Sequence, residues 1–285
     1  MAKVHVFTCI ACGYQGKWRL WRRFPTFLFG VPFEVWRCPE CGLGRTCPKP
    51  EVGVEHYEDN QRYNILFVEK RELYLKFAEA LLKTLDDLIA PQGKKLLDIG
   101  CGGGFVVEYA NQIGFQAEGV DANRQMVAFG RQQGLNVYQA DVMEVSFGGA
   151  DRYDVIVLSA ILEHLPDPAK LLNHIRANLL KDDGFLLVSQ ASYDGLLPRL
   201  FPWGWYGWQP QEHFWHFTPA SFGALSRRCG FVCRRLQRKS LYHPWFVTSR
   251  LRDLVGRNFA AILARIGYAI GRGDSFDCVL QKNAR

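Results

Sequence analysis

The chain has 285 residues, of which 48% are hydrophobic and 22% charged, a composition typical of a soluble globular protein. These values exclude a disordered chain, a collagen-like repeat and a small disulfide-stabilised protein. No uncharged apolar run approaches the roughly 18 residues needed to span a bilayer, and no secretory signal is recognisable, so a cytoplasmic location is expected.

The net charge of +7 is unevenly distributed along the chain. Residues 1–50 carry +6 and residues 227–272 carry +10, so the remaining stretches carry −9. Basic ends indicate an anionic partner. The candidates are nucleic acid, a phosphorylated substrate and a membrane surface. Solvated basic faces without a partner are the alternative.

The first predicted unit is a zinc ribbon over residues 1–50. It contains two Cys-x-x-Cys pairs, each followed by glycine, and the four cysteines are Cys9, Cys12, Cys38 and Cys41. Two residues between thiolates let both sulfurs bind one ion from a tight turn, and four sulfurs complete a tetrahedron. The pattern therefore predicts a structural Zn²⁺ site without an open coordination position. Two redox-active pairs are the alternative, but the strand-and-helix setting of such motifs is missing.

A linker and an amphipathic helix are predicted over residues 51–93. Apolar residues recur at helical spacing from Ile65 to Ile89, and Pro91 and Gly93 end the pattern.

Residues 94–285 alternate short apolar runs with helical patterns. The predicted strands are Lys95–Ile99, Ala117–Val120, Val137–Ala140, Tyr153–Leu158, Phe185–Ser189, Phe231–Arg238 and Phe276–Gln281, and the predicted helices are Phe105–Ile113, Arg124–Gln133 and Ala169–Leu180. This alternation predicts an α/β fold of the Rossmann-like, doubly wound type, with a mostly parallel seven-stranded sheet and helices on both faces.

A glycine-rich turn follows the first of these strands and leads into a helix. Its glycines, Gly100, Gly102 and Gly104, allow backbone amides to approach a ligand. Asp121 ends the next strand, where a carboxylate can accept hydrogen bonds from ribose hydroxyls. Asp98 would repel a pyrophosphate but attract an ammonium group, and the glycine spacing departs from the dinucleotide fingerprint. S-adenosylmethionine has the required nucleoside and amino acid and no phosphate.

From about Lys94 to Phe231 the chain resembles the class I S-adenosylmethionine-dependent methyltransferases. The similar segments are Asp98–Gly104, Asp121, Ala140–Val142, Tyr153–Pro168 and Lys181–Phe185. The resemblance implies methyltransferase activity with S-adenosylmethionine as co-substrate, bound by Asp98, Gly100, Gly102, Gly104, Asp121, Asp141, Val142 and Ser159.

Two further segments narrow the resemblance. Cys41–Pro50 and Trp205–His213 are similar to a bacterial subgroup with an N-terminal four-cysteine ribbon, although Cys47 stands where that subgroup has Asn. The subgroup modifies surface glycans, lipid-linked molecules and natural products. It implies a small-molecule, sugar or lipid-linked acceptor, methylated on oxygen or carbon.

The expected catalytic residues lie in an aromatic segment at 203–217, which can exclude water and stack against an acceptor. His213 is the expected general base, and Glu212 or another nearby carboxylate is expected to orient it. A purely structural role for His213 is the alternative. Glu163 and His164 follow the fourth strand and have the chemistry of metal ligands. No third ligand is evident, so a structural role or a role in the cofactor loop is favoured for this pair.

Other functions remain open at this stage. The ribbon and the basic patches would suit an RNA methyltransferase, although the Ser159–Leu162 segment disfavours methylation of base amino groups. A non-catalytic cofactor-binding scaffold is the third hypothesis. A basic helical insert at 245–272 would either dock on an anionic membrane or pack on the domain. The sequence makes no prediction of oligomeric state.

Overall fold

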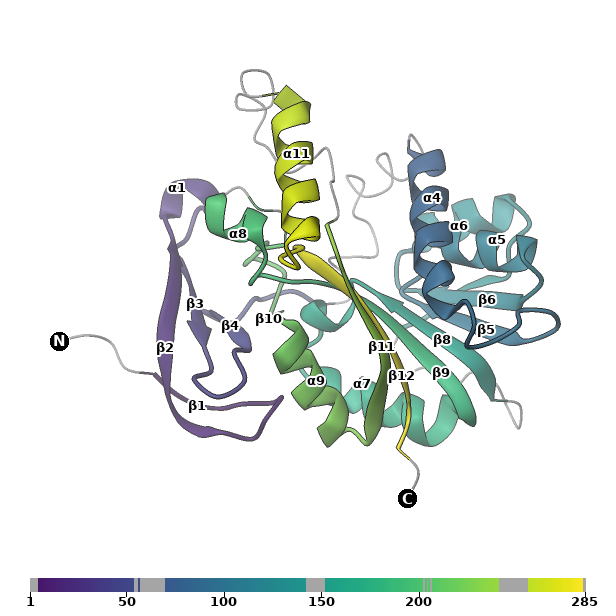
Figure 1. Ribbon diagram of the computed structural model, residues 1–285, viewed down its shortest axis with the longest axis horizontal. Helices are drawn as coiled ribbons and strands as arrows, with labels where there is room; N and C mark the ends of the chain where they lie inside the picture. Colours follow the sequence, from purple (N-terminus) through teal and green to yellow (C-terminus); the bar gives the residue numbers. More distant parts are fainter. Residues whose placement is uncertain are drawn as a thin grey trace.

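The computed structural model contains a small β-sheet, formed mainly by the N-terminal residues, and a large one formed by the rest of the chain (Figure 1). The structure describes residues 5–53, 56, 70–141, 152–201, 203, 205, 207–240 and 256–283. None of the helices within these ranges is long and apolar enough to cross a membrane.

The small sheet combines four N-terminal strands with one strand from far along the chain. Its order is β1-β2-β3-β4-β10, and neighbouring strands are antiparallel. The strands are β1 (His5–Thr8), β2 (Gln15–Phe24), β3 (Phe33–Arg37), β4 (Gly44–Cys47) and β10 (Trp215–His216), with helix α1 (Thr26–Phe29) between β2 and β3. We call residues 5–50 the ribbon. Because β10 belongs to the aromatic segment at 203–217, the ribbon lies directly against that segment.

The large sheet has the order β11-β12-β9-β8-β5-β6-β7. Its strands are β5 (Lys95–Ile99), β6 (Gln116–Asp121), β7 (Val137–Gln139), β8 (Tyr153–Ser159), β9 (Leu180–Ala191), β11 (Phe231–Lys239) and β12 (Ser275–Lys282). Strands β5 to β9 are parallel, and β12 runs antiparallel to both of its neighbours. The predicted mostly parallel seven-stranded sheet is confirmed.

Helices cover both faces of this sheet (Figure 1). One layer contains α4 (Arg71–Leu82), α5 (Phe105–Gln112) and α6 (Arg124–Gln132), and the other contains α7 (Pro168–His174) and α9 (Pro219–Arg228). Successive side chains of a strand point to opposite faces. Accordingly Leu96 of β5 packs in the core beneath the first layer and Leu97 in the core beneath the second. The doubly wound arrangement is confirmed by these two separate cores.

The helix expected over Ala169–Leu180 is shorter in the structure. After α7 the chain forms one π-helical turn, η3 (Ile175–Leu179), and Leu180 already begins β9. Leu180 pairs with Tyr153, and the register of β8 and β9 shifts immediately afterwards. The π-helical turn therefore takes Ile175–Leu179 and strand pairing takes Leu180 from the predicted helix. The helix expected before β5 is described as α4, followed by a 3₁₀ turn, η1 (Lys83–Leu85).

The basic insert contains α11 (Gly256–Ala269), which packs against α8 (Leu196–Leu200). Residues 241–255 of this region lie outside the described ranges. Ile262, Ile266 and Ile270 are each about half exposed and follow one another at four-residue spacing, so they lie on one side. Contact of this side with a membrane stays a prediction. The predicted boundaries at residues 50 and 93 also stay predictions.

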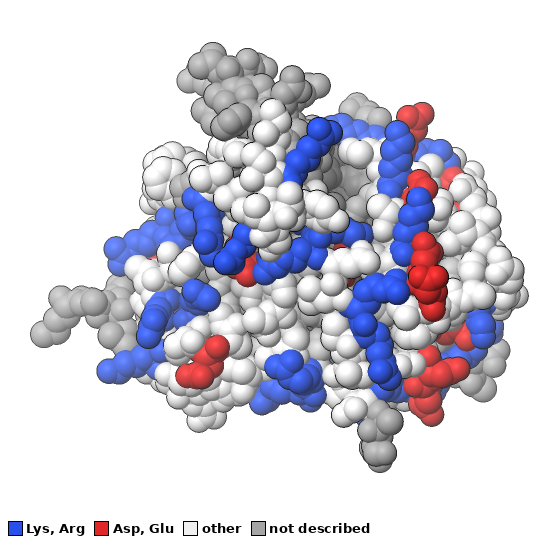
Figure 2. All heavy atoms as spheres, in the orientation of Figure 1, with Lys and Arg blue, Asp and Glu red and all other residues white. Residues whose placement is uncertain are grey.

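The surface charge follows the distribution along the sequence. Figure 2 shows Lys and Arg on both halves of one face, whereas Asp and Glu lie mainly over the half that carries α4 to α6. The half that carries the ribbon is therefore predominantly basic on this face, in agreement with the +6 of residues 1–50.

Candidate functional site

The glycine loop between β5 and α5 has a backbone that side chains would strain. Gly100, Gly102 and Gly104 have φ values of 76°, 52° and 82°, in the left-handed region that favours glycine. A Cβ at Gly100 would lie 2.0 Å from the Cδ1 atom of Ile161. The Gly100 N–H donates to the Val120 carbonyl at 2.7 Å, which fixes the loop to β6. The loop is therefore held tightly against the carboxyl ends of β5 and β6.

Asp121 at the end of β6 is fastened to the same loop. Its carboxylate accepts hydrogen bonds from the backbone N–H groups of Gly102 and Asn123, both at 2.7 Å. Burial raises the pKa of Asp98 to about 8, and the charge of Asp121 adds to this. Burial also raises the pKa of Asp121. The buried carboxyl group of Asp98 and the partly buried carboxylate of Asp121 are close enough to interact, and together they favour a cationic group.

The other expected cofactor residues lie at the same edge of the sheet. Asp141 follows β7, next to Ala140, whose N–H donates to the Asp121 carbonyl at 3.1 Å. Ser159 is the last residue of β8 and pairs with Ser189 of β9. Val142 lies outside the described residues. The structure thus brings Asp98, the three glycines, Asp121, Asp141 and Ser159 to the carboxyl edge of the strands, where α/β sheets bind their ligands.

A second group of side chains combines residues that follow Ile161 in the chain with one residue of the aromatic segment. Glu163 and His164 belong to the 3₁₀ turn η2 (Leu162–His164) that follows β8. The Phe214 N–H donates to the Glu163 carbonyl at 2.8 Å and joins this turn to the aromatic segment. As a result the ligand atoms of Glu163, His164 and His213 all lie within 4.8 Å of one another. We call these three residues the Glu-His-His cluster.

His213 is buried and held in one tautomer. Its Nδ1 lies 3.0 Å from the Gly207 carbonyl, and because a carbonyl only accepts, Nδ1 carries the proton. The Nε2 atom therefore presents a lone pair, and within the described part of the chain it has no hydrogen-bond partner. Burial lowers the pKa of His213 to about 4, so the imidazole is neutral at physiological pH. A neutral imidazole with an available lone pair can accept a proton or bind a metal.

Glu212 has a different neighbour from the one expected. Its Oε1 atom lies 3.5 Å from Nε2 of His56, and the orienting contact of His213 Nδ1 is made by the Gly207 carbonyl instead. The role of Glu212 in catalysis stays a prediction. The aromatic segment around it is largely buried, with Trp205, Trp208 and Phe214 each at most 5% exposed.

The ribbon holds the His213 segment in place, which the sequence did not reveal. Thr46 of β4 donates its hydroxyl to the His213 carbonyl at 2.7 Å, and its N–H donates to the Phe214 carbonyl at 3.1 Å. His216 Nε2 lies 2.9 Å from the same hydroxyl and must be the donor, since the hydroxyl hydrogen is already used. A small cavity lies alongside, and its lining includes Glu163, His213, His216, Gln190, Tyr193 and Trp205.

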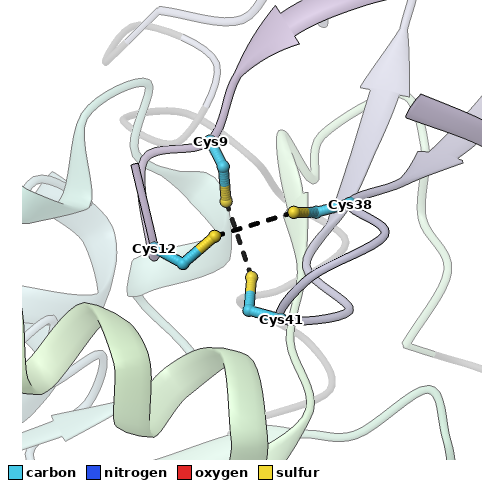
Figure 3. Close-up of side chains that lie close together, drawn as sticks. All are labelled: Cys9, Cys12, Cys38 and Cys41. Carbon is cyan, nitrogen blue, oxygen red and sulfur yellow. Dashed lines mark hydrogen bonds between the residues drawn. The ribbon is translucent and has the colours of Figure 1, made fainter. Parts of the chain in front are cut away.

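The four predicted zinc ligands converge from two turns of the ribbon (Figure 3). Cys9 and Cys41 have their sulfurs 3.5 Å apart, and Cys12 and Cys38 have theirs 3.7 Å apart. A Zn–S bond of about 2.3 Å places the sulfurs of a tetrahedral site about 3.8 Å from one another. The cysteine cluster therefore fits a zinc ion with little movement.

Comparison with known proteins identifies the family. A family model described as a methyltransferase domain matches residues 67–236, more than half of the chain. The chain belongs to this family of class I S-adenosylmethionine-dependent methyltransferases. The match begins after the ribbon, and the cysteine cluster is an addition to the family domain.

Individual relatives are more distant. A ubiquinone biosynthesis O-methyltransferase of Coxiella burnetii is 35% identical over 113 residues, which cover 38% of this chain and 48% of the relative. The chain thus aligns with about half the length of the first curated relatives. A magnesium protoporphyrin IX methyltransferase from Synechocystis, solved with bound SAH, is 16% identical with a TM-score of 0.55, covering 81% of this chain and 97% of its own. A SAM-dependent methyltransferase from Archaeoglobus fulgidus is 19% identical with a TM-score of 0.52, covering 77% of this chain and all of its own. These two structures support the fold alone.

Proposed function

We propose that this protein transfers the methyl group of S-adenosylmethionine to a hydroxyl oxygen of a small organic molecule. The observation that carries the proposal is the available lone pair on His213 Nε2. His213 belongs to the Glu-His-His cluster. The first residue of this cluster, Glu163, follows two residues after Ile161, whose side chain lies against Gly100 of the glycine loop. A hydroxyl acceptor needs a group that removes its proton, whereas the methyl donor is already activated. The names of the curated relatives, which are O-methyltransferases, support the same acceptor class.

In this proposal the glycine loop, Asp98, Asp121, Asp141, Val142 and Ser159 hold the co-substrate, which supplies a methyl group on a sulfonium. The chain then has to align the acceptor and remove a proton. His213 Nε2 accepts the hydroxyl proton as the oxygen–methyl bond forms, and the resulting imidazolium returns it to solvent. The buried aromatic side chains exclude water from the acceptor. The cysteine cluster holds a structural Zn²⁺ that fixes the ribbon.

Labelled methyl transfer tests the acceptor class. The protein is incubated with S-adenosylmethionine carrying a labelled methyl group and with phenols, sugars, lipid-linked glycans and RNA in separate reactions. We expect the label in a small molecule, attached to oxygen by mass spectrometry. A label attached to carbon would show that carbon accepts the methyl group in place of oxygen. A label in the sugar or lipid-linked glycan reactions would favour the acceptors that the bacterial subgroup implies. Label confined to RNA, or no transfer to any acceptor, would contradict the proposal.

Binding of the co-substrate should depend on pH through Asp98. Its carboxyl group, with a pKa of about 8 in the free protein, is mostly protonated below that pH. A bound ammonium favours the ionised form and lowers the pKa, so binding releases a proton. We expect the Kd for S-adenosylmethionine to rise by on the order of tenfold for each pH unit from pH 8 down to pH 6. Calorimetric titration measures it.

The matched variant for this prediction is Asp98→Asn, which keeps the shape of the side chain and cannot ionise. It should bind S-adenosylmethionine weakly, with the pH dependence largely removed. A wild-type Kd that stays constant between pH 6 and pH 8 would show that Asp98 does not face the ammonium group.

A further inference from the structure

The Glu-His-His cluster has the donor set of a metal site. It offers one carboxylate oxygen and two imidazole nitrogens, all within 4.8 Å of one another. Bonds of about 2.1 Å to one ion place adjacent donors about 3 to 3.5 Å apart. Side-chain adjustments of about an ångström would bring these atoms to that spacing. The sequence pointed to the first two residues as possible ligands, and the structure supplies His213 as the third.

Two of the three donors have unmet hydrogen-bonding capacity in the interior. Glu163 is 2% exposed and His213 is 4% exposed. In the described part of the chain, Glu163 Oε2 and His213 Nε2 are buried and have no hydrogen-bond partner. Buried polar atoms are nearly always paired, so two such atoms from one cluster of possible ligands indicate a missing ligand. One atom carries negative charge when ionised and the other a lone pair, so a cation satisfies both.

The surroundings of the cluster resemble the outer contacts of metal sites. Ligating histidines usually donate their second ring nitrogen to a carbonyl or carboxylate, which fixes the tautomer. The Gly207 carbonyl does this for His213. Gln190 lines the same small cavity as Glu163 and favours its ionised form, and the ring of His164 packs edge-on against that of His213 with centroids 4.5 Å apart. The ring of His213 is therefore fixed within the cluster, and the possible ligand atoms of all three residues lie within 4.8 Å of one another.

We propose that Glu163, His164 and His213 bind a divalent transition-metal cation that coordinates the acceptor hydroxyl. Mixed nitrogen and oxygen donors suit Mn²⁺, Fe²⁺, Co²⁺ and Zn²⁺, whereas Mg²⁺ and Ca²⁺ prefer oxygen alone. Three protein ligands leave positions for acceptor oxygens, as in catalytic sites and unlike the cysteine cluster. The acceptor class becomes a molecule with a hydroxyl able to coordinate the ion, alone or with an adjacent oxygen.

This inference rests on the proposed function and changes one of its steps. Nε2 of His213 cannot bind a cation and accept a proton at the same time. In the metal-loaded protein the cation lowers the pKa of the coordinated hydroxyl, whose proton passes to bulk water. The oxygen then attacks the methyl group, the sulfur–methyl bond breaks, and its electron pair stays on sulfur. Direct proton transfer to His213 describes the metal-free protein.

Zinc alone serves as the probe. The number of zinc ions bound per chain distinguishes occupation of the cysteine cluster alone from occupation of both clusters, without an activity measurement. The full chain is dialysed against a buffer of fixed free Zn²⁺ concentration, and bound zinc per chain is measured by mass spectrometry. We expect two zinc ions per chain in the wild type. We expect one zinc ion per chain in each of Glu163→Gln, His164→Gln and His213→Gln. In these variants the affinity of the Glu-His-His cluster for zinc should fall by more than roughly 10–100-fold, the loss that follows removal of a residue that only contacts a metal ligand.

The control is His174→Gln, which replaces a histidine of α7 outside the cluster and should retain two zinc ions. The single ion retained by the cluster variants also shows that their ribbon is folded. If a variant of a buried residue fails to fold, His164→Gln still decides, because His164 is only partly buried.

One zinc ion per chain in the wild type, or two in all the cluster variants, would overturn the metal site. Methyl transfer by a protein with one zinc ion would leave the proposed function intact and remove only this inference. Two zinc ions per chain without methyl transfer to any acceptor would support the metal site and contradict the proposed function.

Discussion

Replacing His213 by glutamine should lower kcat/KM for methyl transfer by about 10²–10⁴, the usual range for loss of a proton-transfer group. The variant keeps a polar side chain of similar length but lacks the imidazole lone pair. S-adenosylmethionine should bind with unchanged affinity, because the glycine loop, Asp98 and Asp121 are untouched. Steady-state kinetics with the acceptor, together with calorimetric titration of the co-substrate, measure the two effects separately.

The comparison variants show whether the effect is specific to the lone pair. His174→Gln should have wild-type activity. Glu212→Gln should lower activity less than His213→Gln, because the neighbour of Glu212 is His56 and the orienting contact of His213 comes from Gly207. A His213→Gln protein with full activity would assign this histidine to packing. A parallel loss of S-adenosylmethionine affinity would assign it to the co-substrate site instead.

The cofactor loop could be predicted from the sequence because its determinants are local. Gly100, Gly102 and Gly104 are needed for a left-handed backbone, and this requirement shows in a short stretch of sequence. The strand limits of β5 agree with the prediction residue for residue. The cysteine cluster was predictable for the same reason, since each half of it is one turn with a fixed spacing of ligands.

The acceptor side depends on contacts between distant residues. Glu163 and His213 meet because they follow β8 and β9, which are adjacent parallel strands in the sheet. The sequence placed both residues at the ligand edge, but the order of the strands was needed to place them within 4.8 Å. Thr46 carries no motif at all. Its hydrogen bond to the His213 carbonyl depends on the pairing of β10 with β4, two strands that are far apart in the sequence.

The difference at α7 has another physical origin. Apolar residues at helical spacing continue through Ile175 and Leu179, and both are buried. That pattern cannot distinguish an α-helix from the π-helical turn η3, because both bury the same face. The early start of β9 is fixed by the pairing of Leu180 with Tyr153 across the sheet, and this pairing leaves no local sequence signal.

Removing zinc from the cysteine cluster should inactivate the protein through the contacts of Thr46. Metal binding is the main source of stability in small four-cysteine units, worth roughly 10–16 kcal/mol in isolated peptides. Here the ribbon is also supported by packing and by its pairing with β10. We therefore expect Cys38→Ser to lower the free energy of unfolding by about 3 kcal/mol or more, which is roughly 6–12 °C in Tm for a chain of this size. Calorimetry of the zinc-loaded wild type and the variant measures it.

The control for this variant is Cys47→Ser. Cys47 lies in β4 but outside the cysteine cluster, so the same substitution should leave the zinc content unchanged and cost little stability. Equal destabilisation by both variants would show that the cysteines matter for packing and not as ligands.

Thr46→Val connects the ribbon to catalysis. It leaves all four cysteines in place but removes the hydroxyl that donates to the His213 carbonyl and accepts from His216. Loss of these buried hydrogen bonds should cost about 1–3 kcal/mol of stability. It should also lower kcat by roughly tenfold, since small displacements of a catalytic group are costly, with the zinc content unchanged. Because Cys38→Ser also loosens β4, its loss of activity should be at least as large. Full activity in the zinc-free protein would mean that the His213 segment keeps its position without the ribbon, and the ribbon would then have to act elsewhere.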